Sequence, residues 1–448
     1  MNGADDLQRA KRCAQNEPIL PPAAALTAAE SGGGTPCASA EVGFIEKGTP
    51  VFRRTVLAMF SAGFATFALL YCVQPLLPIL SWEFGMDAAK ASLVLSVATA
   101  LLAAGLVFTG PLSDALGRKP VMLVGMFGAA LCTLGVAVMP NWHAVLVLRG
   151  LVGLCLSGVV AVAMTYLSEE IAPNVLGFAM GLYIAGNAIG GMLGRLVVGV
   201  IVDFVSWRWA LGVLGGLSLL AALVFWRNVP PSRHFRPTPL QPSTLLDGFR
   251  LHLRDAALPW LFLEGFLLLG GFVTLFNYIS YRLLAEPYRL SQAIVGSVSA
   301  VYIAGIYSST SVGALADRLG RRRVLWVAIA VMLAGVLITL ASPLWVVLVG
   351  MLIFTGGFFG AHSVASSWIG RRARRARGQA SSLYLLCYYV GSSMAGTSGG
   401  IFWHRWGWTG VGLFIAGLLV VALLVAVRLS RVPPLEVTAG ADGRTGNG

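Results

Sequence analysis

The chain has 448 residues, of which 57% are hydrophobic and 11% are charged, and its formal net charge is +13. A soluble protein would carry about a quarter charged residues, and the mean hydropathy here is +0.78. The composition therefore excludes an ordinary soluble domain and predicts an integral membrane protein in a lipid bilayer. The basic residues gather in alternate loops between apolar segments, so the excess charge does not indicate nucleic-acid binding.

The two ends of the chain are polar. Residues 1–54 are rich in alanine, proline, glycine, serine and threonine and contain no long apolar run. Such a composition cannot bury enough apolar surface to order itself. We therefore expect residues 1–54 to form a disordered cytoplasmic tail and the polar segment 429–448 to form a second one.

Twelve apolar runs lie between the tails, and each approaches the ~20 residues that cross a hydrocarbon core of about 30 Å. The first six are predicted as helices within a domain of residues 55–226, over 55–80, 88–112, 120–139, 144–167, 176–202 and 209–226. The other six are predicted within a domain of residues 258–428, over 258–283, 293–315, 324–340, 344–369, 379–403 and 409–427.

A polar linker, residues 227–257, separates these two domains and contains five prolines and five arginines. Within it, residues 243–255 show helical periodicity, which favours a helix lying along the membrane surface. An ordered connector without a special role is the alternative. Arginines gather in the linker and in most of the alternate loops, apart from the loop with Glu169 and Glu170, which has no basic residue. The positive-inside rule therefore places the linker and both termini in the cytoplasm.

Two sequence repeats relate the domains. A loop motif recurs at a constant shift of 203, pairing Gly110 with Gly313, Asp114 with Asp317, Gly117 with Gly320 and Arg118 with Arg321. A second segment, 180–194, matches residues 381–395 at a shift of 201. Six spans per repeat make the repeat parallel, so we predict an all-α membrane protein of twelve transmembrane helices in two pseudo-symmetric halves. Parallel repeats of this kind place a substrate site near the midplane between the halves.

At these motifs the chain resembles the major facilitator superfamily. The loop GPLSDALGRKP and its echo GALADRLGRRR fit the signature of that superfamily, and Arg149 with Gly153 resembles its arginine motif. The segment GNAIGGMLGR is similar to the glycine-rich antiporter motif of drug:proton antiporters, although Asn187 replaces the usual proline. Together with YCVQPLLPIL, it resembles the acriflavine-sensitivity branch of bacterial exporters.

The resemblance implies a secondary transporter of the bacterial inner membrane, which exports small amphipathic or drug-like compounds in exchange for protons by alternating access. Proton-coupled uptake of a small metabolite is the alternative, because residues do not reveal direction. We expect a monomer without cofactor or metal. An enzyme is not expected, since the chain contains no nucleophile–base pair, metal cluster or nucleotide-binding loop.

The repeated loop has a predicted conformational role. Gly117 permits a tight turn, and Arg118 and Lys119 follow it as positive-inside residues. The resemblance implies that Asp114 and Arg118 lock the two halves together at the cytoplasmic side. A solvated turn without that function is the alternative reading.

Three ionisable residues within predicted spans are candidates for proton coupling, since a charge inside a span is costly and marks function by default. Arg149 could instead extend to the membrane interface, and Arg195 could pair with Asp203. Glu264 is the clearest acid within an apolar stretch. The alternative to a role in proton coupling is that Glu264 lies at the membrane interface and pairs with the linker arginines. Polar and aromatic residues at helical spacing are candidate lining for a substrate cavity, namely Tyr71, Gln74, Tyr183, Asn187, Asn277, Tyr278, Tyr281, His362 and Tyr388.

Overall fold

The computed structural model describes residues 43–235, 237 and 242–433, apart from the side chains of residues 242–246. All its helices lie in one unit that begins at Phe44. Helices are the expected solution for long apolar runs, because a helix satisfies its backbone hydrogen bonds internally where no water is available. Most of the two predicted tails lies outside the described residues.

The helices before the linker form the N-terminal half, α2 to α8. Their bounds are α2 Pro50–Tyr71, α3 Leu77–Glu83, α4 Ala88–Leu116, α5 Arg118–Val138, α6 Trp142–Glu170, α7 Pro173–Val202 and α8 Trp207–Asn228. The linker contains α9, Pro242–Leu253, which agrees with the helix predicted there. Its position relative to a membrane surface stays a prediction.

The helices after the linker form the C-terminal half, α10 to α15. Their bounds are α10 Leu258–Leu284, α11 Gln292–Ser297, η1 Val298–Val301, α12 Tyr302–Leu319, α13 Arg321–Ile338, α14 Leu344–Arg372 and α15 Arg377–Arg431. The predicted eighth span is thus a composite of α11, η1 and α12. The predicted last two spans are both in α15, which leaves helical geometry at Gly407.

Within the described residues, ten helical segments are long and apolar enough to cross a membrane. One of them is α15, which contains two spans joined at Gly407. Helix α13, which begins with three arginines, is not among the ten. It packs against α14. The structure therefore confirms an all-helical membrane fold of two six-span halves.

Two predicted boundaries were wrong at the first span. The chain is ordered from well before Thr55, because the backbone of Ile45 bonds to Glu170 and Ala172, and α2 begins at Pro50. The span is also not continuous to residue 80, since α2 ends at Tyr71 and α3 begins at Leu77. The break contains one proline and is followed by another within α3, and proline lacks the N–H that a continuous helix needs.

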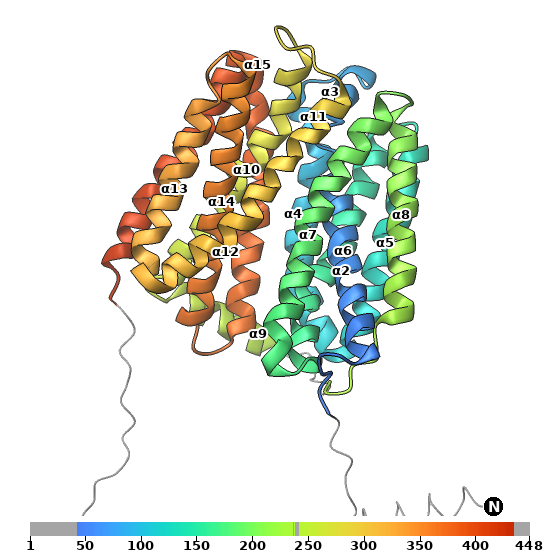
Figure 1. The fold of residues 1–448 in the computed structure, drawn as a ribbon, viewed down its shortest axis with the longest axis vertical. Helices are drawn as coiled ribbons and strands as arrows, with labels where there is room; N and C mark the ends of the chain where they lie inside the picture. The colour runs from blue at the N-terminus through green and yellow to red at the C-terminus, as the bar shows by residue number, and fades with distance from the viewer. Residues whose placement is uncertain (1–42, 236, 238–241, 434–448) are drawn as a thin grey trace, which may run out of the picture. The chain divides into compact units, whose positions relative to one another are not determined.

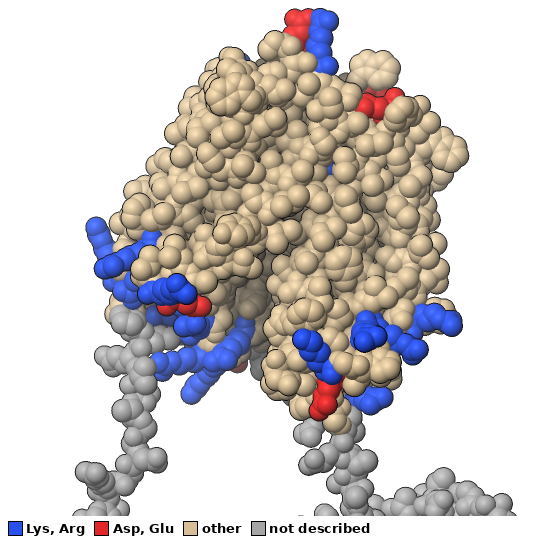
Figure 2. Space-filling model, viewed as in Figure 1, with Lys and Arg blue, Asp and Glu red and all other residues tan. Residues whose placement is uncertain are grey.

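Two pairs of helices join the halves. Helix α4 packs against α6 in its own half and against α15 in the other. Helix α7 packs against α2 in its own half and against α11 in the other. In Figure 1 the halves stand side by side with α4 and α7 at their boundary, and α9 lies near the end where both described chain ends emerge. Basic side chains gather at that end in Figure 2. We call it the arginine-rich end; α5 begins there with Arg118, α13 begins there with Arg321, and α14 ends there at Arg372.

A glycine stripe on α7 holds this helix close to α2. A Cβ at Gly186 would lie 2.6 Å from the Phe60 carbonyl oxygen, and one at Gly190 would collide with the Phe64 carbonyl. Small residues allow such close approach of helices in lipid. These glycines therefore allow α7 to pack closely on α2 within the N-terminal half.

Candidate functional site

A cavity of about 820 Å³ lies between the two halves. Its lining includes Asp114 and Arg118 from the N-terminal half and Gly378 from the C-terminal half, all at the arginine-rich end. It extends to Tyr71 and Tyr302 deep between the halves. Figure 2 shows the hollow between the halves at the arginine-rich end. The cavity thus enters from that end and stops within the span of the helices.

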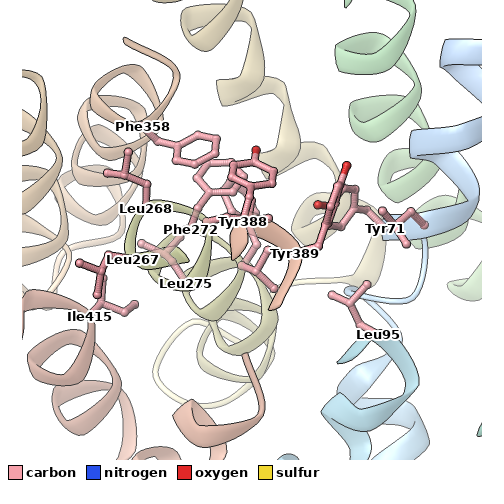
Figure 3. Close-up of a cluster of buried hydrophobic side chains, with 14 of the residues drawn as sticks. Tyr71, Leu95, Leu267, Leu268, Phe272, Leu275, Phe358, Tyr388, Tyr389 and Ile415 are labelled. Carbon is pink, nitrogen blue, oxygen red and sulfur yellow. The ribbon is translucent and has the colours of Figure 1, made fainter. Parts of the chain in front are cut away.

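The C-terminal half lines the cavity with aromatic rings. Phe272 on α10 stacks on Phe358 of α14, with ring centroids 3.9 Å apart. The rings of His362 and Tyr388 lie 4.8 Å apart, centroid to centroid. Figure 3 shows Phe272, Phe358 and Tyr388 gathered together, with Tyr389 on the side towards Tyr71. An apolar aromatic wall with few polar groups suits a lipophilic or amphipathic ligand.

The residues predicted to line a cavity fall into two groups. Five of them line it: Tyr71, Tyr183, Asn187, His362 and Tyr388. The remaining four do not line it and lie instead where the halves meet beyond its deep end: Gln74, Asn277, Tyr278 and Tyr281. Helical spacing in the sequence does not distinguish a residue on an open cavity wall from one in a closed contact between the halves.

Hydrogen bonds close the end opposite the arginine-rich end. Gln74 Nε2 donates to Asn277 Oδ1 at 2.8 Å, and these positions differ by 203, the shift of the sequence repeat. Equivalent positions of the two halves therefore meet each other. Ser81 and Tyr281 share a hydrogen bond of 2.6 Å, and Ser393 on α15 donates to the carbonyl of Ser96 on α4 at 2.8 Å.

Arg149 is fully buried and does not extend to the membrane interface. Its Nη1 and Nη2 donate to the carbonyls of Leu69 and Leu70, each at 2.8 Å, and its Nε donates to the Val94 carbonyl at 3.1 Å. The last carbonyls of a helix have no partner within the helix. Arg149 donates hydrogen bonds to carbonyls at the end of α2. It therefore has a structural role, whether or not it also takes part in proton coupling.

Arg195 on α7 is also buried, and it does not pair with Asp203. Its Nε donates to Gln74 Oε1 at 2.6 Å. The Asp203 carboxylate instead accepts from the backbone N–H groups of Gln292 and Ala293, each at 2.9 Å, at the start of α11. Asp203 therefore joins α7 to the C-terminal half.

Glu264 on α10 is fully buried, and neither carboxylate oxygen has a hydrogen-bond partner among the described residues. Glu264 makes no pairing with the linker arginines that the structure describes. The Tyr384 ring packs against the adjacent residue, Gly265, and the Tyr384 hydroxyl bonds to His362 Nδ1 at 2.8 Å. Tyr384 and His362 both line the cavity, so Glu264 lies one residue away from a position that packs against a cavity residue.

The first copy of the repeated loop closes on its own half. Arg118 bonds to Asp114, and its Nη2 donates to Glu169 Oε1 of α6 at 2.7 Å. Gly117 has φ 99°, a conformation that only glycine adopts without strain. Lys119 Nζ donates to the Val229 carbonyl at 2.6 Å. In this conformation Asp114 makes no bond to the other half among the described residues, so the locking role stays a prediction for the opposite conformation.

The second copy has the same geometry with different partners. Gly320 has φ 89°. Asp317 bonds to Arg321 and also accepts from Arg371 Nη2 at 3.1 Å. Unlike Asp114, Asp317 does not line the cavity. Gly110 lines the cavity mouth, whereas its repeat partner Gly313 faces Ser363 of α14.

Sequence reasoning missed several cavity residues, including Phe272, Tyr302, Tyr384 and Tyr389. Three of these lie in runs of apolar residues that are typical of any membrane span. Tyr384 carried a usable signal, because it aligns with Tyr183 in the repeat at a shift of 201, and both residues line the cavity.

Comparisons with known proteins agree with this architecture. A family model described as Major Facilitator Superfamily matches residues 59–309 and 278–445. The inner membrane transport protein YnfM of Escherichia coli (strain K12) is 61% identical over 388 residues, which cover 87% of this chain and 93% of that protein. The chloramphenicol resistance protein CraA of Acinetobacter baumannii is 27% identical over 303 residues, which cover 66% of this chain and 73% of that protein.

A solved structure has a similar fold. It is a bacterial homologue of the human lysosomal transporter Spinster, in an inward-facing and occupied conformation, with a TM-score of 0.70. The two sequences are 13% identical, and the match covers 85% of this chain and 96% of the other, so the likeness concerns the fold alone. The relatives support a transporter family but do not specifically support the drug:proton antiporter branch.

Proposed function

Because the chain belongs to the Major Facilitator Superfamily, and is thus a multi-pass inner-membrane transporter, we propose that it exports small amphipathic compounds in exchange for protons. The observation that carries this proposal is the cavity between two pseudo-symmetric halves, open at one end and closed at the other by bonds between the halves. A cavity of this kind supports alternating access by rocking of one half against the other. The arginine-rich end is proposed to face the cytoplasm.

The compounds are proposed to be lipophilic because the wall is aromatic. Phe272, Phe358 and Tyr388 supply large apolar surfaces. Polar residues also line the cavity, among them Asn187, His362 and several serines, which suits a ligand with a polar group as well. The volume of about 820 Å³ falls within the range of about 300–1,000 Å³ that holds drug-sized ligands. The name of the relative CraA, a chloramphenicol resistance protein, is in keeping with export of such compounds.

Proton exchange is proposed through Glu264. An ionised carboxylate without partners is costly in an apolar interior, so a site that gains and loses a proton accounts for its presence. Tyr384, which lines the cavity, packs against Gly265 beside Glu264, and this neighbourhood supports a route for the proton to the cavity. Arg149 and Arg195 are the other candidates, but both guanidinium groups already donate to carbonyl or amide oxygens.

The experiment uses proteoliposomes that contain the full chain and an entrapped fluorescent pH indicator. A panel of aromatic amphiphiles of different charge is added, and we expect at least one compound to drive proton movement that protein-free liposomes do not show. Glu264→Gln should abolish this movement while counter-flow of the labelled compound continues. The matched control is Glu286→Gln, since that carboxylate lies exposed near the opposite end.

Three outcomes would contradict parts of the proposal. Compound transport that is indifferent to a pH gradient in either orientation would remove proton exchange. Wild-type proton movement in Glu264→Gln would remove Glu264 from the mechanism. Accumulation of the compound together with protons, in the same direction, would indicate the alternative, proton-coupled uptake.

A further inference from the structure

Arg195 carries a positive charge that no acid in the described residues neutralises. Its side chain is 3% exposed, and no ion pair involves it within the described part of the chain. Nε donates to Gln74, and Nη1 donates to the Gly191 carbonyl at 2.5 Å. Nη2 is buried and has no hydrogen bond of good geometry among the described residues, although Arg195 interacts with the side chain of Tyr302. This donor therefore has no strong acceptor in the described conformation.

The guanidinium lies at the deep end of the cavity. Its carbon is 4.9 Å from the ring centroid of Tyr71 and 4.8 Å from that of Tyr302. Both tyrosines and Gly191 line the cavity. Aromatic rings stabilise a cation but do not neutralise it. A ligand that fills the cavity thus ends against two tyrosines, and the guanidinium packs on both of their rings.

The surroundings do not supply the missing negative charge. The one acid that lines the cavity among the described residues is Asp114, which lies at the mouth and bonds to Arg118. Glu264 does not line the cavity. The repeat places Gly396 at the position equivalent to Arg195, so the C-terminal half offers no acid there. The charge is therefore a feature of one half and not of the shared scaffold.

A purely structural role accounts for only part of this geometry. Through its Nε, Arg195 donates to Gln74 and orients the amide that bonds to Asn277. This structural role explains the hydrogen bond of Nε. A neutral glutamine or histidine could orient Gln74 without the cost of a buried cation. The charge and the orphan donor Nη2 need a separate explanation. An arginine prefers a planar, two-oxygen anion, to which two of its N–H groups can donate at once.

We propose that Arg195, with Tyr71 and Tyr302, forms a subsite for the acidic group of an amphipathic organic anion. The apolar part of that ligand would occupy the aromatic wall at Phe272 and Phe358. This inference names the substrate class of the proposed function and rests on it, because it assumes that the cavity receives the transported compound. In the described conformation Arg195 lies behind Tyr71 and Tyr302 and does not itself line the cavity. A shift of these two rings would let Nη2 donate to the bound carboxylate or sulfonate, and the tyrosine hydroxyls can donate as well.

The test measures equilibrium binding to the full chain in lipid nanodiscs, with empty nanodiscs as the background. The probes share one skeleton and differ in charge: naphthalene-2-carboxylate, naphthalene-2-carboxamide and naphthalen-2-yl-trimethylammonium. We expect the wild type to bind the carboxylate at least about tenfold more tightly than the other two, as a charge-assisted hydrogen bond predicts. Equal binding of all three, tighter binding of the amide or the cation, or no binding of the carboxylate would overturn the inference.

Substitutions test whether Arg195 causes the preference for the carboxylate. Arg195→Gln should lose the tenfold preference for the carboxylate while its binding of the carboxamide changes less than twofold. Arg195→Lys should retain part of the preference, and this charged variant is informative if Arg195→Gln does not fold. The control Arg289→Gln, an exposed arginine, should bind like the wild type. An unchanged preference in Arg195→Gln would overturn the inference.

The binding test and the proton test fail independently. Binding in nanodiscs needs no gradient, so a selective anion site without proton movement would leave this inference intact and contradict the exchange mechanism. Proton-coupled transport of neutral or cationic compounds, without anion preference, would support the exchange mechanism and overturn this inference.

Discussion

Two buried arginines near the closed end have different environments. Arg149 donates to three backbone carbonyls, which makes it part of the framework that ends α2. Arg195 donates to one side chain and one carbonyl and keeps a free donor within the described residues. Burial alone, which is all that the sequence could suggest, does not separate the two. The number of acceptors around each guanidinium does.

Arg149→Gln should therefore destabilise the protein. Three carbonyls would lose their charged donor, and each buried polar group left without a partner costs about 1–3 kcal/mol. We expect a loss of about 3 kcal/mol or more, seen as a lower Tm and a smaller monodisperse fraction of the purified protein. Arg149→Lys should retain only part of the stability, because an ammonium lacks the planar fork of donors.

Arg289→Gln is the control, since that side chain lies exposed, and its Tm should match that of the wild type. If Arg149→Gln keeps the wild-type Tm and yet loses transport, the structural account of Arg149 is wrong and a role in coupling is favoured.

At the scale of elements, the joint between the linker and α10 is held by one carboxylate. Asp255 accepts from Arg372 Nε at 3.1 Å and from the N–H groups of Ala257 and Leu258 at 2.8 and 2.9 Å. Burial opposes its ionisation, but these hydrogen bonds outweigh burial and lower the pKa of Asp255 below its ordinary value. The linker is thus connected to the end of α14 by an ionised group.

The lowered pKa of Asp255 fixes how stability depends on pH. Its contribution is fully present above the unfolded pKa of about 3.9 and is lost as pH falls through the lower native value. Asp255→Asn should lower the Tm at pH 7, by the equivalent of about 1.5–3 kcal/mol for hydrogen bonds to a charged group. The difference from the wild type should shrink as the pH falls below 4.

Thermal unfolding of both proteins from pH 7 to pH 3 measures this, with the exposed Asp247→Asn as a matched control on α9. A difference that persists unchanged at pH 3, or no difference at pH 7, would show that the charge of Asp255 does not hold the joint.

The two copies of the repeated loop should differ in function. Asp114 lies at the cavity mouth between the halves, whereas Asp317 contacts only residues of its own half among those described. If Asp114 meets the other half when that mouth closes, Asp114→Asn should slow counter-flow several-fold at a normal yield of folded protein. Asp317→Asn should slow it less. Equal slowing by both variants, or loss of folded protein in both, would indicate a purely structural loop.

At the scale of the whole molecule, the sequence was sufficient for the architecture and insufficient for the cavity. The repeated loop and the twelve apolar runs predicted two six-span halves correctly, because lipid admits few ways to satisfy the backbone. The break after Tyr71 was missed although Pro75 and Pro78 were visible, since apolar length outweighed the missing N–H groups.

The site is harder to predict for a physical reason. Gln74 and Asn277 differ by the repeat shift and meet on the pseudo-symmetry axis, but a repeat does not reveal which equivalent positions touch. Nor does it reveal which aromatic faces border open space, since Phe272 reads as any apolar span residue. These properties depend on how the halves are tilted, and one chain can adopt more than one tilt.

The central claim is that the two halves alternate between opening at the arginine-rich end and opening at the opposite end. The most direct measurement is the distance between spin labels on the full chain in lipid, by double electron–electron resonance. One pair is placed at positions 116 and 319, which are exposed at the arginine-rich end, and a second at 143 and 345, exposed at the opposite end. A control pair at 143 and 209 lies within the N-terminal half.

Across changes of pH and added amphiphile, we predict that the 143–345 distance lengthens as the 116–319 distance shortens, while the 143–209 distance stays constant. Single, unchanging distances for both pairs under every condition, or distances that lengthen together, would contradict alternating access between these halves.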